Sequence, residues 1–497
     1  MGAKGDLRAE GDMMTLTKKR SADFTVGPIF FKMVLFILPL LLSNLLQIFY
    51  NAADMMIVGL SDEVNAVGAI GTTGSITALI VNLFIGFSTG ATVMIARHLG
   101  AKDHKMVSRT VHTALSMSVI FGLTAGVVGV AFSRPILVLM GAEAELLDLA
   151  ALYTKIYFLG IPFVSIANYT ISIFRAKGDS KTPLLVLSLT GLVNVGLNLV
   201  FVLILHMSVD GVAIATTVSQ ALNAVILLIL LSKDNSACRF SPKKLCLDKR
   251  AFGEILYIGL PSGIQSALFS LSNIIISSSI LRVNNAMTVV GSTYQPVVNG
   301  NAAAANLESF VFTAINAVHS GVVTFTGQNA GARQPQRVHR VLWLGLTCSL
   351  GVTVFFSLLL FFLRAPLFAL YGVVDGAADS LEHIAFNTAE LRFYFHLLPL
   401  VLYAFFDTCN AVARGLKRAI SSTVITLIGT CFLRIVWIFT VFERFETLDT
   451  IYISFPLSWL ITGAVLFVMV LEVLKKECAD ANTPTANEER RQIAERN

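Results

Sequence analysis

Charge is the scarcest property of this sequence. Charged residues form 14% of the 497 residues, whereas hydrophobic residues form 55%. This balance excludes a soluble domain of ordinary composition. The sequence also lacks a Walker GxxxxGK[ST] sequence and an HExxH sequence, and its six cysteines show no metal-ligand spacing. We therefore expect neither an ATPase nor a metal enzyme, and we expect no cofactor.

Long apolar segments dominate what is present. Each is long enough for a helix that crosses the roughly 30 Å hydrocarbon core of a bilayer. The sequence therefore predicts an all-α polytopic membrane protein with twelve transmembrane helices. They lie near residues 30–58, 67–96, 110–132, 150–174, 183–205, 211–232, 252–280, 289–327, 341–363, 388–412, 420–442 and 450–474.

Basic residues gather in alternate connections between these segments. Connections 2-3, 4-5, 6-7, 8-9 and 10-11 carry nineteen Lys and Arg residues, and the other six carry four. The positive-inside rule makes the first set cytoplasmic, together with both termini. We expect residues 1–28 to be a cytoplasmic leader and 475–497 a polar cytoplasmic tail. The net charge of +6 then reflects loops beside anionic lipid, and we expect no nucleic-acid partner.

The chain repeats its landmarks at half length. Each half has a Leu-Pro step in its first segment, a Gly-Ala-basic turn after its second and an Arg-containing turn after its fourth. These pairs are Pro39 with Pro261, Gly100 with Gly331, and Arg175 with Arg414. Such symmetry is typical of transporters. We expect pseudo-symmetric six-helix lobes at 29–232 and 252–474, joined by a cytoplasmic loop at 233–251.

Asp54 is the only acidic residue in the first apolar segment. A carboxylate near the bilayer centre costs about 2.5 to 3.5 kcal/mol on insertion scales, and such groups usually serve as proton or cation sites. Its counterpart in the second half is Ile276. We therefore expect ion coupling to depend on the first lobe.

Several sequence stretches together resemble the multidrug and toxic-compound extrusion (MATE) family, in particular its bacterial DNA-damage-inducible-F-like branch. They are LPLLLSNLLQIFYNAADMMIVG, HLGAKD, FRAKGDSKTPL, GVAIATTVSQ, and GNAAAANLESF with TFTGQNAGA. The resemblance implies two lobes around a central cavity and alternating access. It also implies export of organic cations or amphipathic drugs in exchange for H⁺ or Na⁺. We expect a monomer in the plasma membrane, in contact with membrane lipid.

The resemblance also implies an ion-coupling site in the first lobe. Asp54 matches the family's acid, Asn194 and Asn198 lie on one helix face, and Thr216 matches a hydroxyl ligand. Asn198 departs from the family's usual aspartate, which removes one negative charge. The same four residues would ligate Na⁺, whereas a proton needs only Asp54. Both ions stay open at this point. Pro39 is expected to act as a hinge, with Tyr50 lining the substrate cavity.

Three polar residues of the second lobe are further candidates for the substrate cavity. Asp407 resembles an acidic position of the family and could neutralise a cationic substrate or pair with Arg434. Glu308 is a candidate for contact with the substrate or, alternatively, for a hydrogen bond between two helices. Gln265 stands where some relatives have a glutamate, which argues against coupling through this lobe.

A lipid-linked oligosaccharide flippase of the same superfamily is the alternative function. Such a protein would have a cavity lined by several arginines, and Arg434 and Arg392 are the candidates in this sequence.

Overall fold

The computed structural model describes residues 23–61, 63, 65–140, 143–287, 294–378 and 380–481. All regular secondary structure in this part of the chain is helical. Within the described ranges, eleven helices are long and apolar enough to cross a membrane, and one further pair is bent by 41° at a short break. Counting that pair as one span gives twelve, at the twelve predicted positions. The all-α, twelve-helix prediction is therefore confirmed, while the leader and most of the tail lie outside the described residues.

The first half forms six spans. Asp103 begins one of them, because its side chain accepts a hydrogen bond from the Met106 amide at 3.0 Å. The spans are α2 (Ile29–Val58), α3 (Ala66–Gly100), α4 (His104–Leu139), α5 (Ala144–Ala176), α6 (Lys181–Leu199) with the π-helical turn η1 (Val200–Ile204), and α7 (Val209–Ser232). A short 3₁₀ turn, η2 (Pro242–Lys244), lies in the connection that follows.

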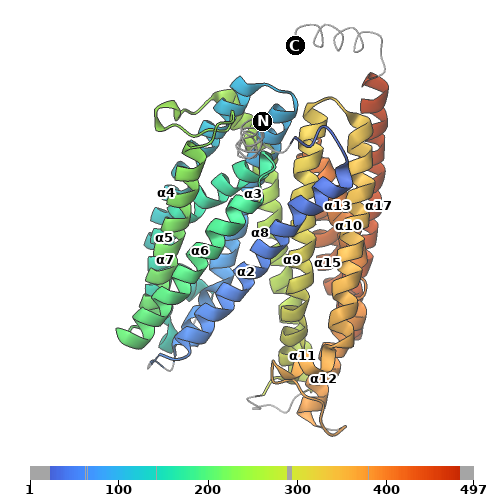
Figure 1. Ribbon diagram of the computed structural model, residues 1–497. Helices are drawn as coiled ribbons and strands as arrows, with labels where there is room; N and C mark the ends of the chain where they lie inside the picture. Colours follow the sequence, from blue (N-terminus) through green and yellow to red (C-terminus); the bar gives the residue numbers. More distant parts are fainter. Residues whose placement is uncertain are drawn as a thin grey trace, which may run out of the picture.

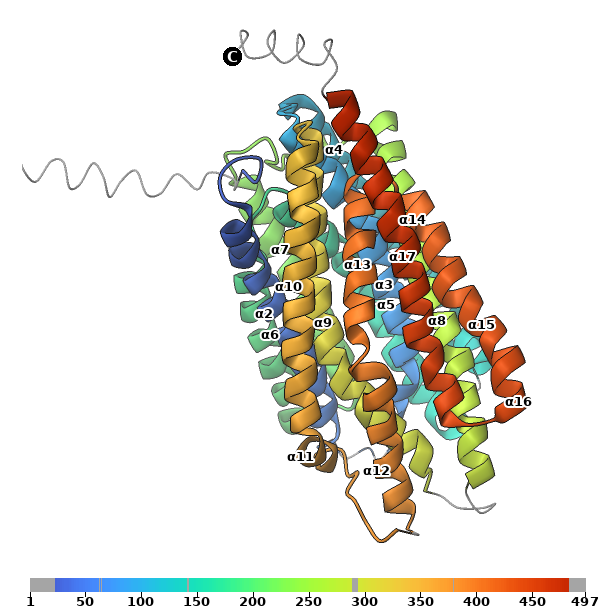
Figure 2. The same ribbon diagram turned by 90° about the vertical axis from the view of Figure 1, so that its right-hand side faces the viewer.

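The second half contains six spans in more numerous pieces. They are α8 (Lys249–Met287), α9 (Pro296–Gly331), α10 (Pro335–Phe362) followed by the short α11 (Arg364–Ala369), α12 (Leu381–Arg392) with η3 (Phe393–Leu397) and α13 (Leu400–Gly415), the run α14 (Ala419–Thr426), η4 (Leu427–Phe432), α15 (Leu433–Trp437), η5 (Ile438–Phe442) and α16 (Glu443–Phe445), and α17 (Leu448–Ala481). In Figure 2, α17 runs along α13 and α15, which it contacts.

The repeated turns share their backbone conformation. Lys102 and Arg333, the basic residues of the two Gly-Ala-basic turns, have positive φ angles of 56° and 53°. Gly178 and Lys417, in the turns after the fourth helix of each half, have φ angles of 83° and 62°. A left-handed residue directly after a helix is a common way to end it. The sequence repeat is thus also a repeat of local structure.

The first helix of each half crosses between the two groups of helices. The beginning of α2, with Met33 and Phe36, packs into the buried apolar cluster of the second half, whereas Ile57 near its end packs into the first half. In the same manner α8 begins among first-half residues at Ile255 and ends among second-half residues at Ile276. The contacts of α2 with α9 and of α3 with α8 follow from this crossing.

The two groups of helices meet closely where α3 and α9 end. A Cβ on Gly100 would overlap the Gln328 carbonyl, and a Cβ on Gly331 would overlap the Arg97 carbonyl. These two contacts involve the matching Gly-Ala-basic turns of the sequence repeat. In Figure 1 the ribbons converge at this end, where the described chain also begins and ends, and diverge toward the other end.

The outer surfaces of the helices are apolar. Exposed side chains include Phe31, Val127 and Leu192, at 71%, 70% and 68% exposure. Apolar surface of this extent is unusual on a soluble monomer, and it matches helices that face lipid. The polar residues Asn198, Glu308 and Thr426 are instead fully buried inside the helix groups. Asn198 and Glu308, two of the candidate site residues, therefore lie in the interior.

Candidate ion-coupling site

Asp54 lies near the end of α2, among the helices of the first half. Its side chain is partly buried, and its Oδ1 accepts a hydrogen bond from Asn198 Nδ2 at 2.5 Å. Thr216 on α7 also faces the Asp54 carboxylate. Three helices that are distant in the sequence therefore meet at this carboxylate.

The two asparagines extend the contact along α6. Because they are four residues apart on one helix, their side chains lie one above the other, and Asn198 Nδ2 is 3.5 Å from Asn194 Oδ1. Asn194 Nδ2 is in turn 3.5 Å from Thr216 Oγ1. The four residues predicted to form the ion site are thus joined by hydrogen bonds in one chain.

One oxygen in this chain has no hydrogen-bond partner. Asn198 Oδ1 is buried and finds none among the described residues. Buried amide oxygens are normally satisfied, and an unsatisfied one requires an explanation such as an ion or a water molecule. The site can therefore offer oxygen atoms from a carboxylate, two amides and a hydroxyl, which are the ligand types that a hard cation prefers.

Tyr50 lies one turn before Asp54 on α2 and packs against α6. Its hydroxyl donates a hydrogen bond to the Ser188 carbonyl at 3.2 Å, and its ring occupies the space where Gly191 lacks a side chain. Tyr50 therefore helps to join α2 to α6. In this conformation it is engaged within the first half, beside the ion site.

The sequence reasoning missed two tyrosines on α5. Tyr153 lies within electrostatic range of Asp54, and its ring is stacked on Tyr157 with a centroid separation of 6.1 Å. Both rings are directed to the same side because they are four residues apart. That spacing in the sequence YTKIY was the available signal.

Pro39 lies inside α2, which continues through it from Ile29 to Val58. Proline cannot donate the backbone hydrogen bond of a helix interior, so this position is a weak point of the helix. One turn later, the Ser43 hydroxyl donates a hydrogen bond to the Pro39 carbonyl at 2.8 Å. The hinge role stays a prediction.

Asp407 on α13 is paired with a histidine. His319 Nδ1 on α9 is 3.0 Å from Asp407 Oδ2, and both side chains are largely buried. Arg434, the suggested partner of Asp407, instead donates from Nε to Ser458 Oγ at 2.8 Å and lies over the Phe455 ring. The pairing of Asp407 with Arg434 is therefore not the arrangement found.

Gln265 is buried in α8 and binds the second Arg-containing turn. Its Oε1 accepts a hydrogen bond from Arg414 Nη2 at 2.9 Å and another from Thr423 at 3.3 Å. It therefore connects α8 to α13 and α14. A neutral amide at this position leaves the Arg414 guanidinium without a carboxylate hydrogen-bonded to it among the described residues.

Glu308 is completely buried and forms an ion pair. Its Oε2 accepts from Arg392 Nη2 at 2.8 Å and lies 2.9 Å from His396 Nδ1. Arg392 also donates to Asn301 Oδ1 at 2.7 Å. This is the interhelical contact that the sequence left as the alternative, and it keeps Glu308 away from any surface that a substrate could touch in this conformation.

The structure thus joins the first-half residues in one chain of hydrogen bonds, whereas the second-half candidates bind different partners. Ile276, the counterpart of Asp54, is 4% exposed in an apolar cluster. Asp407, Glu308 and Gln265 each bind a different partner inside the second half. The charge asymmetry between the halves is therefore also an asymmetry of local structure.

Comparison with known proteins identifies the family. The MatE family model matches residues 39–200 and 261–440, once in each half. The chain is 30% identical over 322 residues to the probable multidrug resistance protein YoeA of Bacillus subtilis, covering 63% of this chain and 67% of that protein. It is 27% identical over 266 residues to the multidrug export protein MepA of Staphylococcus aureus, covering 53% and 58% of the two chains.

Solved structures show the same fold. An outward-facing multidrug resistance MATE transporter of the MOP superfamily aligns with a TM-score of 0.82 at 19% identity, covering 93% of this chain and 99% of that one. A MATE protein in complex with MaL6 aligns with a TM-score of 0.83 at 19% identity, covering 93% and 100%. The DNA-damage-inducible-F-like branch stays a prediction. This chain belongs to the MATE family, and it is a membrane transporter rather than an enzyme.

Proposed function

We propose that this protein is a secondary antiporter that exports cationic or amphipathic organic compounds in exchange for a monovalent cation, H⁺ or Na⁺. The observation that carries the proposal is the Asp54 carboxylate, which is bonded to Asn198 and faces Thr216 among the helices of the first half. The names of the relatives support the cargo, since YoeA is described as a probable multidrug resistance protein and MepA as a multidrug export protein.

The site suits a cation that binds and leaves. A single carboxylate surrounded by neutral amides and a hydroxyl gives a net charge of −1 when empty and zero when H⁺ or Na⁺ is bound. Neutralisation lowers the cost of holding this group among apolar helices. Because Asp54 touches α6 and α7 from α2, loading the site changes the contacts between three helices and can favour one conformation over another.

The conformation described here fits the release of cargo to the outside. The lobes meet at Gly100 and Gly331, beside the basic turns that the positive-inside rule makes cytoplasmic. The ribbons diverge toward the opposite end (Figure 1). We therefore place the protein in the plasma membrane. Its converging end, with both termini, then faces the cytoplasm.

The flippase alternative gains no support from the arginines of the second half. Arg392 is neutralised by Glu308, and Arg434 binds Ser458 and aromatic rings. These contacts lie within the second half, where the two side chains are buried, rather than around a basic cavity.

The proposal is tested in proteoliposomes that contain the purified full chain. Ethidium accumulation is measured after a pH gradient alone, a Na⁺ gradient alone, or neither is imposed, with protein-free liposomes as the blank. We expect accumulation with one of the two gradients, and the effective one identifies the ion. Equal accumulation without any gradient would overturn antiport.

A further inference from the structure

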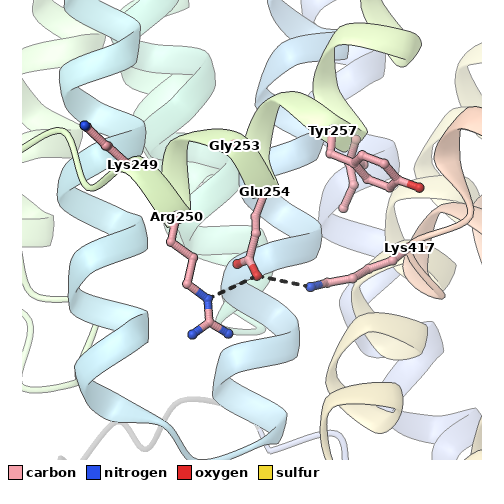
Figure 3. A pocket seen from close by; sticks show the side chains of 7 residues that line it. Lys249, Arg250, Gly253, Glu254, Tyr257 and Lys417 are labelled. Atoms are coloured by element: carbon pink, nitrogen blue, oxygen red, sulfur yellow. Dashed lines mark hydrogen bonds and ion pairs between the residues drawn. The ribbon is translucent and has the colours of Figure 1, made fainter.

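A basic pocket lies at the beginning of α8, on the end where the lobes meet. It has a volume of about 430 Å³ and is lined by Lys249, Arg250, Glu254 and Tyr257 from α8 and by Lys417 from the connection between α13 and α14. In Figure 3, Arg250 and Lys417 converge on the Glu254 carboxylate from opposite sides, at 3.6 and 3.5 Å. Lys249 lies further out along the same helix.

Positive charge is in excess in this pocket. Three cationic side chains line it, against the single carboxylate of Glu254, and that carboxylate is also 3.3 Å from His98 of α3. The Arg250 side chain is 72% exposed and Lys417 is 36% exposed, so their nitrogen atoms are accessible. The pocket therefore favours an anion.

An apolar stripe continues from the pocket along α8. Its exposed residues recur every three or four positions, so they lie on one face of the helix. Arg250 and Lys249 precede Tyr257 by seven and eight residues, which places them on the same side. The stripe consists of Tyr257, Leu260, Ile264, Leu268, Leu271 and Ile274.

The dimensions of pocket and stripe match an amphiphile of the bilayer. At about 1.5 Å per residue, the stripe from Tyr257 to Ile274 extends roughly 25 Å, more than the roughly 15 Å hydrocarbon depth of one leaflet. A phospholipid whose phosphate lies in the pocket could therefore keep its acyl chains against apolar side chains for their whole length. A free phosphate ion would use the cations but leave the stripe unused.

We propose that this pocket binds the headgroup of an anionic phospholipid, whose acyl chains lie along the exposed face of α8. The site does not depend on the ion-coupling role of Asp54. It does depend on the contact between the lobes, because Lys417 of the second half reaches Glu254, where α8 begins among first-half residues, and Arg97 Nη1 of α3 donates to the Gly415 carbonyl at 3.1 Å. A lipid bound here favours the conformation in which this end is closed.

Tail-labelled lipids test the proposal. Ile264→Trp places a fluorescent reporter on the stripe, and its quenching is measured with brominated phosphatidylglycerol and with brominated phosphatidylcholine. Protein without the reporter provides the background from Trp343, Trp437 and Trp459. We expect phosphatidylglycerol to quench at a several-fold lower mole fraction than phosphatidylcholine. Equal quenching by the two lipids would overturn the proposal.

Charge-matched variants locate the preference. In the reporter background, Lys249→Gln, Arg250→Gln and Lys417→Gln together should weaken phosphatidylglycerol binding, by about fivefold for each cation removed. The control combines Lys105→Gln, Lys243→Gln and Lys244→Gln, which removes the same charge from exposed positions outside the pocket. A control that loses the preference equally would refute the site, because the effect would then be one of net charge.

Two further measurements complete the test. Lys249→Gln alone leaves the Glu254 ion pairs intact, so it serves as the test if the triple variant does not fold. Its affinity for phosphatidylglycerol should be about fivefold lower. Inorganic phosphate should not displace the brominated phosphatidylglycerol, since it cannot use the stripe. Full displacement by phosphate would show a free-anion site and contradict lipid binding.

Discussion

Asn198 donates a hydrogen bond across 2.5 Å to Asp54, joining two residues that are 144 positions apart in the sequence. The amide occupies the place where relatives of this protein usually have a second acid, as the sequence resemblance implies. It supplies a donor to the carboxylate and keeps one buried oxygen of its own without a partner. The site therefore has one charge and several neutral ligands, and the predictions below begin from that balance.

Asp54→Asn should abolish gradient-driven efflux while leaving the protein folded. The substitution keeps the shape of the side chain but removes the only charge that H⁺ or Na⁺ can neutralise there. We expect ethidium accumulation to fall to the level of protein-free liposomes, measured with both gradients. The matched control is Asp148→Asn, which removes an exposed carboxylate paired with Arg134 and should retain transport. Efflux that persists in Asp54→Asn would remove Asp54 from the coupling mechanism.

Asn198→Asp should make transport more dependent on Na⁺. Two carboxylates in hydrogen-bonding contact cannot both stay ionised unless a cation lies between them, and added ligand charge strengthens cation binding. The concentration of Na⁺ that gives half-maximal efflux should therefore decrease. Asn198→Ala, which removes the amide without adding charge, should not produce this change. An unaltered Na⁺ response in Asn198→Asp would show that residue 198 does not contact the ion.

Glu308→Gln should destabilise the second half. Removing one partner of a buried ion pair leaves the other charge uncompensated and costs about 3 to 5 kcal/mol. The apparent midpoint of thermal unfolding in detergent should fall for Glu308→Gln and for Arg392→Gln. The double variant should lose less than the sum of the two, because the pair is removed as a unit.

An exposed ion pair provides the control for that measurement. Arg282 and Glu443 are 2.7 Å apart, but their side chains are about half exposed. Glu443→Gln should therefore lower the midpoint much less than Glu308→Gln does. If both substitutions lowered the midpoint equally, burial would not be the cause.

Gly100→Ala should weaken the closed end of the molecule. The added Cβ would overlap the Gln328 carbonyl, so α3 and α9 cannot keep this contact. Spin labels at positions 105 and 340, in a background with the six cysteines replaced by serine, should show a larger share of long distances. Gly351→Ala is the control, because nothing lies within 4 Å of its Cβ. Identical distance distributions in both variants would contradict a closed end held by this contact.

Much of the fold could be predicted because its signals are local. Apolar length predicted the twelve spans, and the repeated turns at Gly100 and Gly331 predicted two related halves. The first-half site was predictable for a different reason. Asp54 stood out as the lone acid of an apolar segment, Asn194 and Asn198 share a face by helical spacing, and the family resemblance supplied Thr216.

The second-half partners were not predictable in this way. Asp407 pairs with His319 across 88 positions, and Glu308 pairs with Arg392 across 84. Neither pair has a helical spacing, because each joins residues of different helices. The sequence showed that these polar groups would be costly among apolar helices, but it did not show which helix would satisfy each one.

The sequence by itself determined that this chain spans a membrane, that landmarks of its first half recur in the second and that a single acid, Asp54, lies in its first apolar segment. Those properties follow from hydrophobicity and charge, which each segment carries regardless of its neighbours. The tertiary structure decided which buried charges are neutralised internally, where the lobes close and where cations gather beside an apolar face. Those properties depend on distances between helices, and packing sets these distances only when the whole chain is folded.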